Sequence, residues 1–485
     1  MSPLVLFALT IFEALRLALR AMLLVLSSHF FRAAWTSSRA PDPQAPADPA
    51  EWPHVTVQIP VRNEYYVVER VVRAVAGLDY PRGKLQIQVL DDSTDATRER
   101  AAEICASLAA EGLDISHVFR EAPTGFKAGA LNAALPDAKG EFVAMFDSDC
   151  VPGPDFLRRT LPWFSDPSVA CVQVRWAFLN RDRSLLTRVQ ALVLDGLFAV
   201  DQFSRAAQRL PLQFNGTNGV WRRVALQEVG QWSPAILAED ADLSFRAYLA
   251  GYRVAHLRDY TVPTELPTEM AAFRAQQRRW ALGSAQMLRT LTLPILRSRL
   301  SWRAKLMMFM HLGRHSIDPL VLLACVTTPL TTLYGMPFLV DYGVVANIAI
   351  VGLVLLSALA FYARALAQVG AKRREVVLVP CIILLAIGLS IVYTTAVFRG
   401  LVGSGGEFVR TPKSGDATKR RVGPVYRAPV DIAVLVEVAT AAAHGYFTYL
   451  ALRAAYYPYA AFFATAAVAF GWVGLGSLAS RLRRG

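Results

Sequence analysis

Cysteine is scarce in this chain of 485 residues. Five occur, and none forms a C-x-x-C pair, which excludes a disulfide-stapled scaffold and favours reduced, packed thiols. The G-x-x-x-x-G-K-[ST] motif is missing as well, so a Walker-type ATPase is excluded. Any phosphate group must therefore be bound by a cation and by side chains.

Acidic residues are in short supply relative to basic ones. The chain has 38 Asp and Glu against 51 Lys and Arg, a net charge of +13, while 54% of its residues are apolar. That apolar fraction excludes a disordered protein. Most of the charge excess lies in residues 313–485, which hold 16 basic and 7 acidic residues. Basic residues beside long uncharged runs indicate a membrane protein rather than a nucleic-acid-binding one.

Four apolar runs are long enough to span a bilayer. They cover residues 319–340, 342–363, 431–452 and 456–480. A fifth run, 376–398, lies between the basic loops 364–375 and 399–429, and both loops should be cytoplasmic. We therefore expect 376–398 to lie in the interface or to re-enter, with Pro380 as the break.

The N-terminal part reads as an anchor followed by a linker. Residues 1–36 form an apolar helix that carries Glu13, Arg16 and Arg20, and no small-residue cleavage site follows it. Its charges leave open whether it spans the membrane or lies in the interface. Residues 37–53 are rich in proline and predict a stiff linker.

Residues 54–269 alternate between strand and helix patterns. Strands are predicted at 55–60, 85–90 and 142–146, and helices at 64–78 and 95–110. This order predicts a parallel sheet with helices on both faces and ligands at the carboxyl ends of the strands. Basic, amphipathic helices at 270–315 are expected to lie on the cytoplasmic face of the membrane, ahead of a channel-like domain at 316–485.

Acidic clusters end two of these strands. Asp147 and Asp149 are the hard oxygen ligands that Mg²⁺ or Mn²⁺ takes beside a diphosphate, although a solvated turn has the same pattern. Asp91 and Asp92 could equally cap a helix, as could the later Glu239-Asp240 pair. A final motif, Gln276-x-x-Arg279-Trp280, suits a phosphate and a sugar ring, or a membrane surface.

Taken together, these motifs resemble the D, D-x-D, E-D, Q-x-x-R-W series of membrane-bound family-2 glycosyltransferases. Supporting segments are VQIPVRNE at 57–64, GFKAGALN at 125–132, QFNGTNGVWR at 213–222, AEDADLSFR at 238–246 and TELP at 264–267. The sequences of these segments are most similar to those of cellulose-synthase-like mannan and glucomannan synthases, and the resemblance is dense over residues 53–290. One departure is Ala238, where the family usually has Thr. The resemblance implies a nucleotide-sugar-binding (GT-A-like) α/β domain inserted in an α-helical membrane domain with interfacial helices.

The resemblance also implies roles for individual residues. Asp91 or Asp92 would contact the nucleotide base, and Asp147 and Asp149 would hold a divalent cation, Mg²⁺ or Mn²⁺, on the diphosphate. Asp240, beside Glu239, would be the general base. The remaining donor and acceptor contacts would come from Lys127 and Arg279, and from Asn215, Gly216, Thr217 and Trp280.

Residues 407–413 resemble the gating loop of polysaccharide synthases, with Phe408, Arg410 and Thr411 as its core. Arg410 stands where valine is common in that family. The loop falls in the second basic segment, which the charge pattern places on the cytoplasmic face. A solvated basic loop is the alternative interpretation.

The expected protein is a multi-pass membrane enzyme with a cytoplasmic catalytic domain, in the inner or plasma membrane if the source is bacterial. It would polymerise a β-linked, 1,4-type glycan from GDP-mannose or UDP-glucose and export it through its helices. One alternative is a transferase acting on a ceramide-type or polyprenyl-type lipid, and a remote one is a transporter. The sequence makes no prediction about protein partners.

Overall fold

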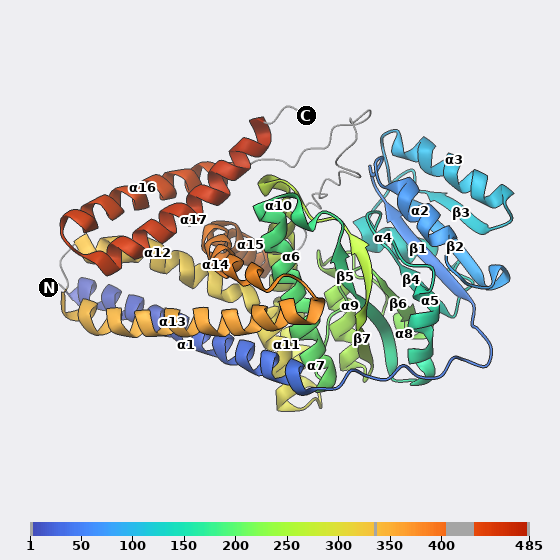
Figure 1. The fold of residues 1–485 in the computed structure, drawn as a ribbon, viewed down its shortest axis with the longest axis horizontal. Coiled ribbons are helices and arrows are strands. Elements are labelled where there is room, and N and C mark those ends of the chain that lie inside the picture. Colours follow the sequence, from blue (N-terminus) through green and yellow to red (C-terminus); the bar gives the residue numbers. More distant parts are fainter. Residues whose placement is uncertain (1–2, 334–336, 404–430, 483–485) are drawn as a thin grey trace.

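The computed structural model describes residues 3–333, 337–403 and 431–482. Figure 1 shows two halves, an α/β domain around one sheet and a set of long helices that extends away from it. The predicted gating-loop residues Phe408, Arg410 and Thr411 lie outside the described residues.

The elements of the α/β half alternate along the chain. Its strands are β1 Val55–Val61, β2 Leu85–Asp91, β3 Asp114–Phe119, β4 Phe142–Met145, β5 Val169–Phe178, β6 Gly219–Arg222 and β7 Arg253–Thr264. Its helices are α2 Val68–Ala76, α3 Thr97–Ala110, α4 Phe126–Ala134, α5 Phe156–Thr160, α6 Leu185–Asp195, α7 Phe203–Ala207, α8 Arg223–Glu228 and α9 Glu239–Leu249. Short helical turns are η1 Arg82–Lys84, η2 Leu161–Ser165, η3 Arg181–Arg183 and the π-helix η4 Gly196–Gln202.

The seven strands form one mixed sheet in the order β3-β2-β1-β4-β6-β5-β7. The three predicted strands, β1, β2 and β4, are parallel as expected. The expectation of a purely parallel sheet is wrong, because β6 runs antiparallel to β4 and to β5. Because β6 is antiparallel to β4, β6 begins at the sheet edge where β4 ends. The segment before β6 therefore lies beside the segment after β4.

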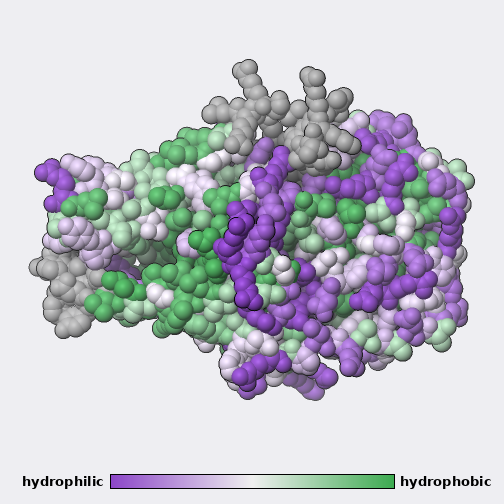
Figure 2. Space-filling view, viewed as in Figure 1, coloured by the Kyte–Doolittle hydropathy of each residue, from purple (hydrophilic) through white to green (hydrophobic). Residues whose placement is uncertain are grey.

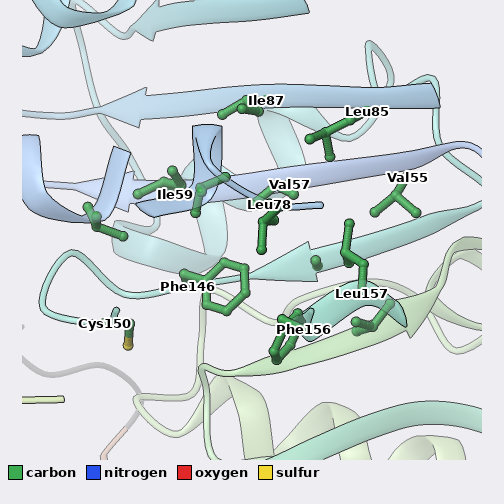
Figure 3. Packing of buried hydrophobic residues seen from close by; sticks show 14 of the residues in the cluster. Val55, Val57, Ile59, Leu78, Leu85, Ile87, Phe146, Cys150, Phe156 and Leu157 are labelled. Carbon is green, nitrogen blue, oxygen red and sulfur yellow. The ribbon is translucent and has the colours of Figure 1, made fainter. Parts of the chain in front are cut away.

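Apolar and polar residues alternate along the first part of β1, which gives the strand two different faces. Val55, Val57 and Ile59 point into one apolar core with Phe146 and Phe156 (Figure 3). Between them, Thr56 and Gln58 face the other side, where they hydrogen bond Gln86 at 2.8 Å and Gln88 at 3.0 Å on β2. Both polar side chains are buried, so these bonds offset the cost of removing them from water.

Two predicted helices are shorter than their sequence patterns. Helix α2 begins at Val68 rather than at residue 64, because residues 62–67 form a turn in which Asn63 has a positive φ of 56°. Helix α3 begins at Thr97, where the Asp95 carboxylate accepts a hydrogen bond from the Thr97 amide. The turn after β1 leaves the side chains of residues 62 and 64 facing the site described below.

The other half is helical. Its elements are α1 Pro3–Arg39, α10 Met270–Arg297, α11 Trp302–Leu312, η5 Arg314–Ile317, α12 Asp318–Leu333, α13 Pro337–Val369, η6 Arg373–Leu378, α14 Val379–Gly388, α15 Ser390–Val402, α16 Ala433–Arg453 and α17 Tyr457–Leu482. Figure 1 shows α1 beside α13, and α16 paired with α17. The predicted boundary at Asp341 is wrong: Pro337 opens α13, and one acidic residue does not interrupt that helix.

Two helical segments among the described residues are long and apolar enough to cross a membrane. They are Val345–Val369 and Tyr457–Arg481, and the bent pair Arg373–Gly388 and Ser390–Val402 would make a third. Figure 2 shows the apolar surface gathered over this half, while hydrophilic residues cover the α/β half. The predicted count of four spans stays a prediction.

The run at 376–398 is a bent helix pair, as a re-entrant or broken segment would be. The bend between α14 and α15 is 49°. It lies at Leu389, so the predicted break at Pro380 is wrong. Pro380 occupies the first turn of α14, where the missing N–H has no helical partner to lose.

Several charges of the helical half have partners within their own helix or in a neighbouring one. Arg16 pairs with Glu13 at 2.6 Å within α1, and Arg20 donates to Asn347 of α13 at 3.0 Å. Glu437, the only charge in the run 432–452, is fully buried and bonds Arg274 of α10 at 3.1 Å. This ion pair joins α16 to α10.

Removing one member of this pair should destabilise the protein. Arg274→Met leaves the Glu437 carboxylate buried without its ion-pair partner, which costs about 3 kcal/mol or more. We expect a lower midpoint of thermal unfolding in detergent, monitored by a thiol-reactive dye, because four of the five cysteines are buried. Arg278→Met is the matched control, since its pair with Asp431 is longer, 3.4 Å, and more exposed. Equal unfolding midpoints for the two variants would contradict a stabilising role for this pair.

Candidate active site

One edge of the sheet gathers nearly all the predicted site residues. The parallel strands β1, β2, β4 and β7 end at this edge, and the antiparallel β6 begins there. The pocket above it is lined by residues at the ends of β1, β2, β4 and β7, by residues that precede β6, and by helices α4, α9 and α10. Figure 1 shows α10 between the two halves. The predicted residues in the pocket lining are Asp92, Lys127, Asp147, Asp149, Asn215, Gly216, Thr217, Glu239, Asp240, Gln276, Arg279 and Trp280.

Asp91 is the last residue of β2 and Asp92 follows it, but their side chains face different surroundings. Asp91 is fully buried and accepts from His117 at 2.9 Å and from the Ser93 amide at 2.8 Å. Burial acts to raise the pKa of Asp91, but these hydrogen bonds outweigh it and leave the pKa lowered. Asp92 lines the pocket and takes a two-pronged contact from Arg120, at 2.8 and 2.6 Å. Of the two carboxylates, only Asp92 borders the pocket.

Asp147 is joined to its neighbours through Lys127. The Lys127 ammonium lies 2.6 Å from Asp147 Oδ1 and donates to the Gly216 carbonyl at 2.7 Å. Burial acts to lower the pKa of Lys127, but the charges of Asp147, Glu239 and Asp240 outweigh it and raise the pKa. The lysine therefore stays positive at the centre of an acidic pocket.

Asp149 is the second carboxylate of the D-x-D pair. Its Oδ2 accepts from the Thr264 hydroxyl at 2.6 Å and from the Glu265 amide at 3.0 Å, at the end of β7. The two carboxylates supply hard oxygens on one pocket wall, which suits Mg²⁺ or Mn²⁺. Among the described residues no group of three or more acidic, His or Cys side chains could hold a metal. A cation here would therefore take its remaining ligands from a diphosphate and water, as Mg²⁺ commonly does.

Glu239 and Asp240 open helix α9 and also line the pocket. Burial, followed by the charge of Asp240, raises the pKa of Glu239 to about 7. Burial also raises the pKa of Asp240, and the charges of Lys127 and Arg279 oppose that rise. Two neighbouring carboxyl groups with raised pKa values are suited to taking up a proton.

Gly216 lies directly against Asp240. It has a positive φ of 81°, and a Cβ at this position would lie 2.7 Å from Asp240 Oδ2. Both observations require glycine here. The chain before β6 can thus bring its backbone up to the carboxylate, with Asn215 and Thr217 on either side.

Helix α10 supplies the Q-x-x-R-W motif. Gln276, Arg279 and Trp280 are spaced i, i+3 and i+4, so they share one face of the helix. All three line the pocket. Trp280 packs on an apolar cluster that includes Trp176, Leu194 and Leu266. An aromatic wall of this kind suits the apolar face of a sugar ring.

Sequence reasoning missed the partners of several carboxylates. His117 and Arg120 come from β3 and its end, a strand whose burial alternates and which carried no strong apolar signal. Arg70 of α2 bonds Glu265 at 2.8 Å and the Asp149 carbonyl at 3.3 Å. No local pattern identifies these partners, because His117 lies 26 residues from Asp91, Arg120 28 from Asp92 and Arg70 79 from Asp149 along the chain.

Comparisons with known proteins agree with this geometry. A family model described as "Glycosyltransferase like family 2" matches residues 53–283. Glucomannan 4-beta-mannosyltransferase 2 of Arabidopsis thaliana is 42% identical over 255 residues, which are 52% of this chain and 48% of that protein. The chain thus spans about half the length of this and several similar curated relatives.

A solved structure has the same fold. The mannosyltransferase PcManGT from Pyrobaculum calidifontis, in complex with GDP-Man and Mn²⁺, superposes with a TM-score of 0.55. The match covers 74% of this chain and 98% of that one at 23% identity. This likeness supports the GT-A-like α/β fold that the sequence motifs implied.

A longer alignment decides the family. Probable glucomannan 4-beta-mannosyltransferase 9 of Oryza sativa subsp. japonica is 33% identical over 401 residues, which cover 80% of this chain and 74% of that protein. The resemblance inferred from the acidic motifs is thereby confirmed. This chain belongs to the family-2 glycosyltransferases.

Proposed function

We propose that the protein is a processive, inverting hexosyltransferase of the membrane. It extends a β-1,4-linked glycan from a cytosolic nucleotide sugar and exports the product through its helical half. The observation that carries the proposal is the convergence of Asp147, Asp149, Asp240 and the Gln276–Trp280 face on one pocket. A donor diphosphate and an acceptor sugar can be held there side by side.

Asp240 is the general base of the proposed reaction. Its raised pKa suits it to accept the proton of an acceptor hydroxyl as the new C–O bond forms at the anomeric carbon. The bond from that carbon to the diphosphate breaks in the same step. A single displacement inverts the anomeric centre, so an α-linked donor gives a β-linked product.

The donor side of the pocket stabilises the leaving group. Lys127 and Arg279 supply positive charge, and Asp147 with Asp149 would hold Mg²⁺ or Mn²⁺. When bound, that cation would neutralise charge on the departing diphosphate. Asp92, held by Arg120, is positioned at the pocket edge for the nucleotide base.

GDP-mannose is the donor we propose, with UDP-glucose as the alternative. The curated relatives are named mannosyltransferases, and the solved neighbour holds GDP-Man. Acceptor contacts are assigned to Trp280 and to Asn215, Gly216 and Thr217. The spans and basic loops of the sequence support a multi-pass protein whose catalytic domain is cytoplasmic.

Removing the proposed base should abolish transfer but spare donor binding. We expect Asp240→Asn to lower kcat by roughly 10²–10⁴-fold, the usual contribution of a general base. Radiolabelled sugar transfer measures the loss, and calorimetric binding of the nucleotide diphosphate checks the donor site. Asp242→Asn is the control. It also removes a carboxylate of α9, but one that already pairs with Arg246 at 2.8 Å on the same helix. Undiminished transfer by Asp240→Asn would rule out this base.

The pH profile should respond to Lys127. Its positive charge lowers the pKa of Asp240, so Lys127→Met should raise that pKa and keep the base protonated up to a higher pH. The acidic limb of kcat/KM for transfer is then expected to move to higher pH. Lys139→Met, whose partner Asp114 lies on the exposed surface, should leave the limb in place. A limb that stays or moves to lower pH in Lys127→Met contradicts the assignment.

Product length tests the whole proposal. The purified full chain in nanodiscs is given radiolabelled GDP-mannose or UDP-glucose, with Mg²⁺, Mn²⁺ or a chelator. We expect a long, alkali-stable glycan that a β-1,4-mannanase or glucanase digests, formed only with a divalent cation. A product consisting of mono-glycosylated lipid alone would instead identify a lipid-acceptor transferase.

A further inference from the structure

A π-helical turn interrupts an otherwise continuous helix beside the pocket. Helix α6 runs directly into η4, Gly196–Gln202, and then into α7. π-helical turns are rare in proteins, and those that occur are often at functional sites. They insert one residue into the helix and so redirect the side chains that follow. Five of the seven residues in η4 are buried. The turn therefore needs a structural or functional reason.

The last residue of the turn holds the proposed acceptor contact. Gln202 Nε2 donates to Asn215 Oδ1 at 2.9 Å, and Asn215 Nδ2 donates to Gln173 Oε1 at 2.7 Å. Gln173 in turn donates to the Gln213 carbonyl at 2.8 Å and to Gln202 Oε1 at 3.3 Å. Gln173 and Gln202 are both fully buried. Two side-chain amides, those of Gln173 and Gln202, thus hold Asn215 in one orientation at the pocket wall.

The residue before Gln202 contacts the helical half. Asp201 accepts from His29 of α1 at 2.8 Å and from Arg205 at 2.7 Å. Consecutive residues of a helix point about 100° apart, so these two side chains reach different partners. Asp201 faces α1, and Gln202 faces the acceptor wall.

The start of the turn is packed on α13. A Cβ added to Gly196 would lie 2.6 Å from a ring carbon of Phe361 and 2.7 Å from one of Tyr362. Both rings are buried and belong to one apolar cluster with α6 residues. Since rings in such a cluster cannot move aside cheaply, η4 must keep glycine at this contact.

We propose that Gln202 is a positioning residue for the acceptor and that η4 holds it in place against α1 and α13. Seated on the helical half at Gly196 and Asp201, the π-turn presents Gln202 to Asn215. The orientation of the Asn215 amide, and with it the shape of the acceptor wall beside Asp240, then depends on this turn. The inference rests on the function proposed above.

Steady-state kinetics of the full chain tests the role of Gln202. The donor is GDP-mannose, or whichever nucleotide sugar the wild type transfers, and the acceptor is a soluble β-1,4-manno-oligosaccharide. Gln202→Leu removes both hydrogen bonds between Gln202 and Asn215, at 2.9 and 3.2 Å, and we expect the KM for the acceptor to rise about tenfold. The KM for the donor should stay within about twofold, because the hydrogen bonds of the Gln202 side chain run to Asn215 and Gln173. Gln202→Glu keeps the volume but replaces the N–H donor to Asn215 Oδ1 with a buried carboxylate oxygen, so it should raise the acceptor KM at least as much.

A second variant acts through packing rather than hydrogen bonding. Gly196→Ala pushes η4 away from Phe361 and Tyr362, and it should raise the acceptor KM in the same selective way. Gly352→Ala on α13 is the matched control, since a Cβ there would meet nothing within 4 Å. It should leave both KM values unchanged.

The outcomes separate this inference from the proposed function. If the wild type transfers no sugar to any acceptor, the proposed function fails. If the wild type transfers sugar but Gln202→Leu leaves the acceptor KM unchanged, only the positioning role is wrong. Equal increases in donor and acceptor KM would point to general loosening of the domain and would also overturn the inference.

Discussion

The site depends on one ion pair at the centre of a crowded acidic pocket. Asp147, Asp149, Glu239 and Asp240 share that pocket, and like charges in a buried site repel strongly. Lys127 counters this repulsion and also ties α4 to the carbonyl of Gly216. One ammonium therefore joins the segment after β4, the segment before β6 and, through its charge, the first turn of α9. Without this positive charge, repulsion among the carboxylates would oppose the approach of these three segments.

Much of this arrangement was predictable, because its signals are local. The alternation of β1 and the apolar runs of β2 and β4 identify three strands, and parallel strands bring their carboxyl ends to one edge. That rule brings the Asp91-Asp92 and Asp147-x-Asp149 clusters to one edge, but it does not choose between Asp91 and Asp92. The i, i+3, i+4 spacing of Gln276, Arg279 and Trp280 likewise predicts a shared helix face. The family resemblance then indicated that these motifs, in this order along the chain, belong to one site.

The features that sequence reasoning missed arise from contacts between distant residues. Strand β6 has only four residues, and its direction is determined by where the chain re-enters the sheet, not by its composition. The bend at Leu389 has no proline, whereas Pro380 lies in the first turn of α14, where it does not break the helix. The partners of Asp91 and Asp92 come from β3, whose register no local pattern specifies. The π-turn, too, has no local sequence signal, and its first residue, Gly196, packs against Phe361 and Tyr362 of the distant helix α13.

Helix α10 belongs to both halves of the molecule. Its Gln276–Trp280 face closes the pocket, while the same helix packs against α15 and α17 and is ion-paired to α16 through Arg274. The α/β half and the helical half are therefore not separable modules. A fragment cut after residue 269 would keep the sheet and its carboxylates but would lose the α10 side of the pocket, and one that ended within α10 would leave that side without its support. A transplanted α/β domain would keep this pocket only if α10 and the helices packed on it were moved with it.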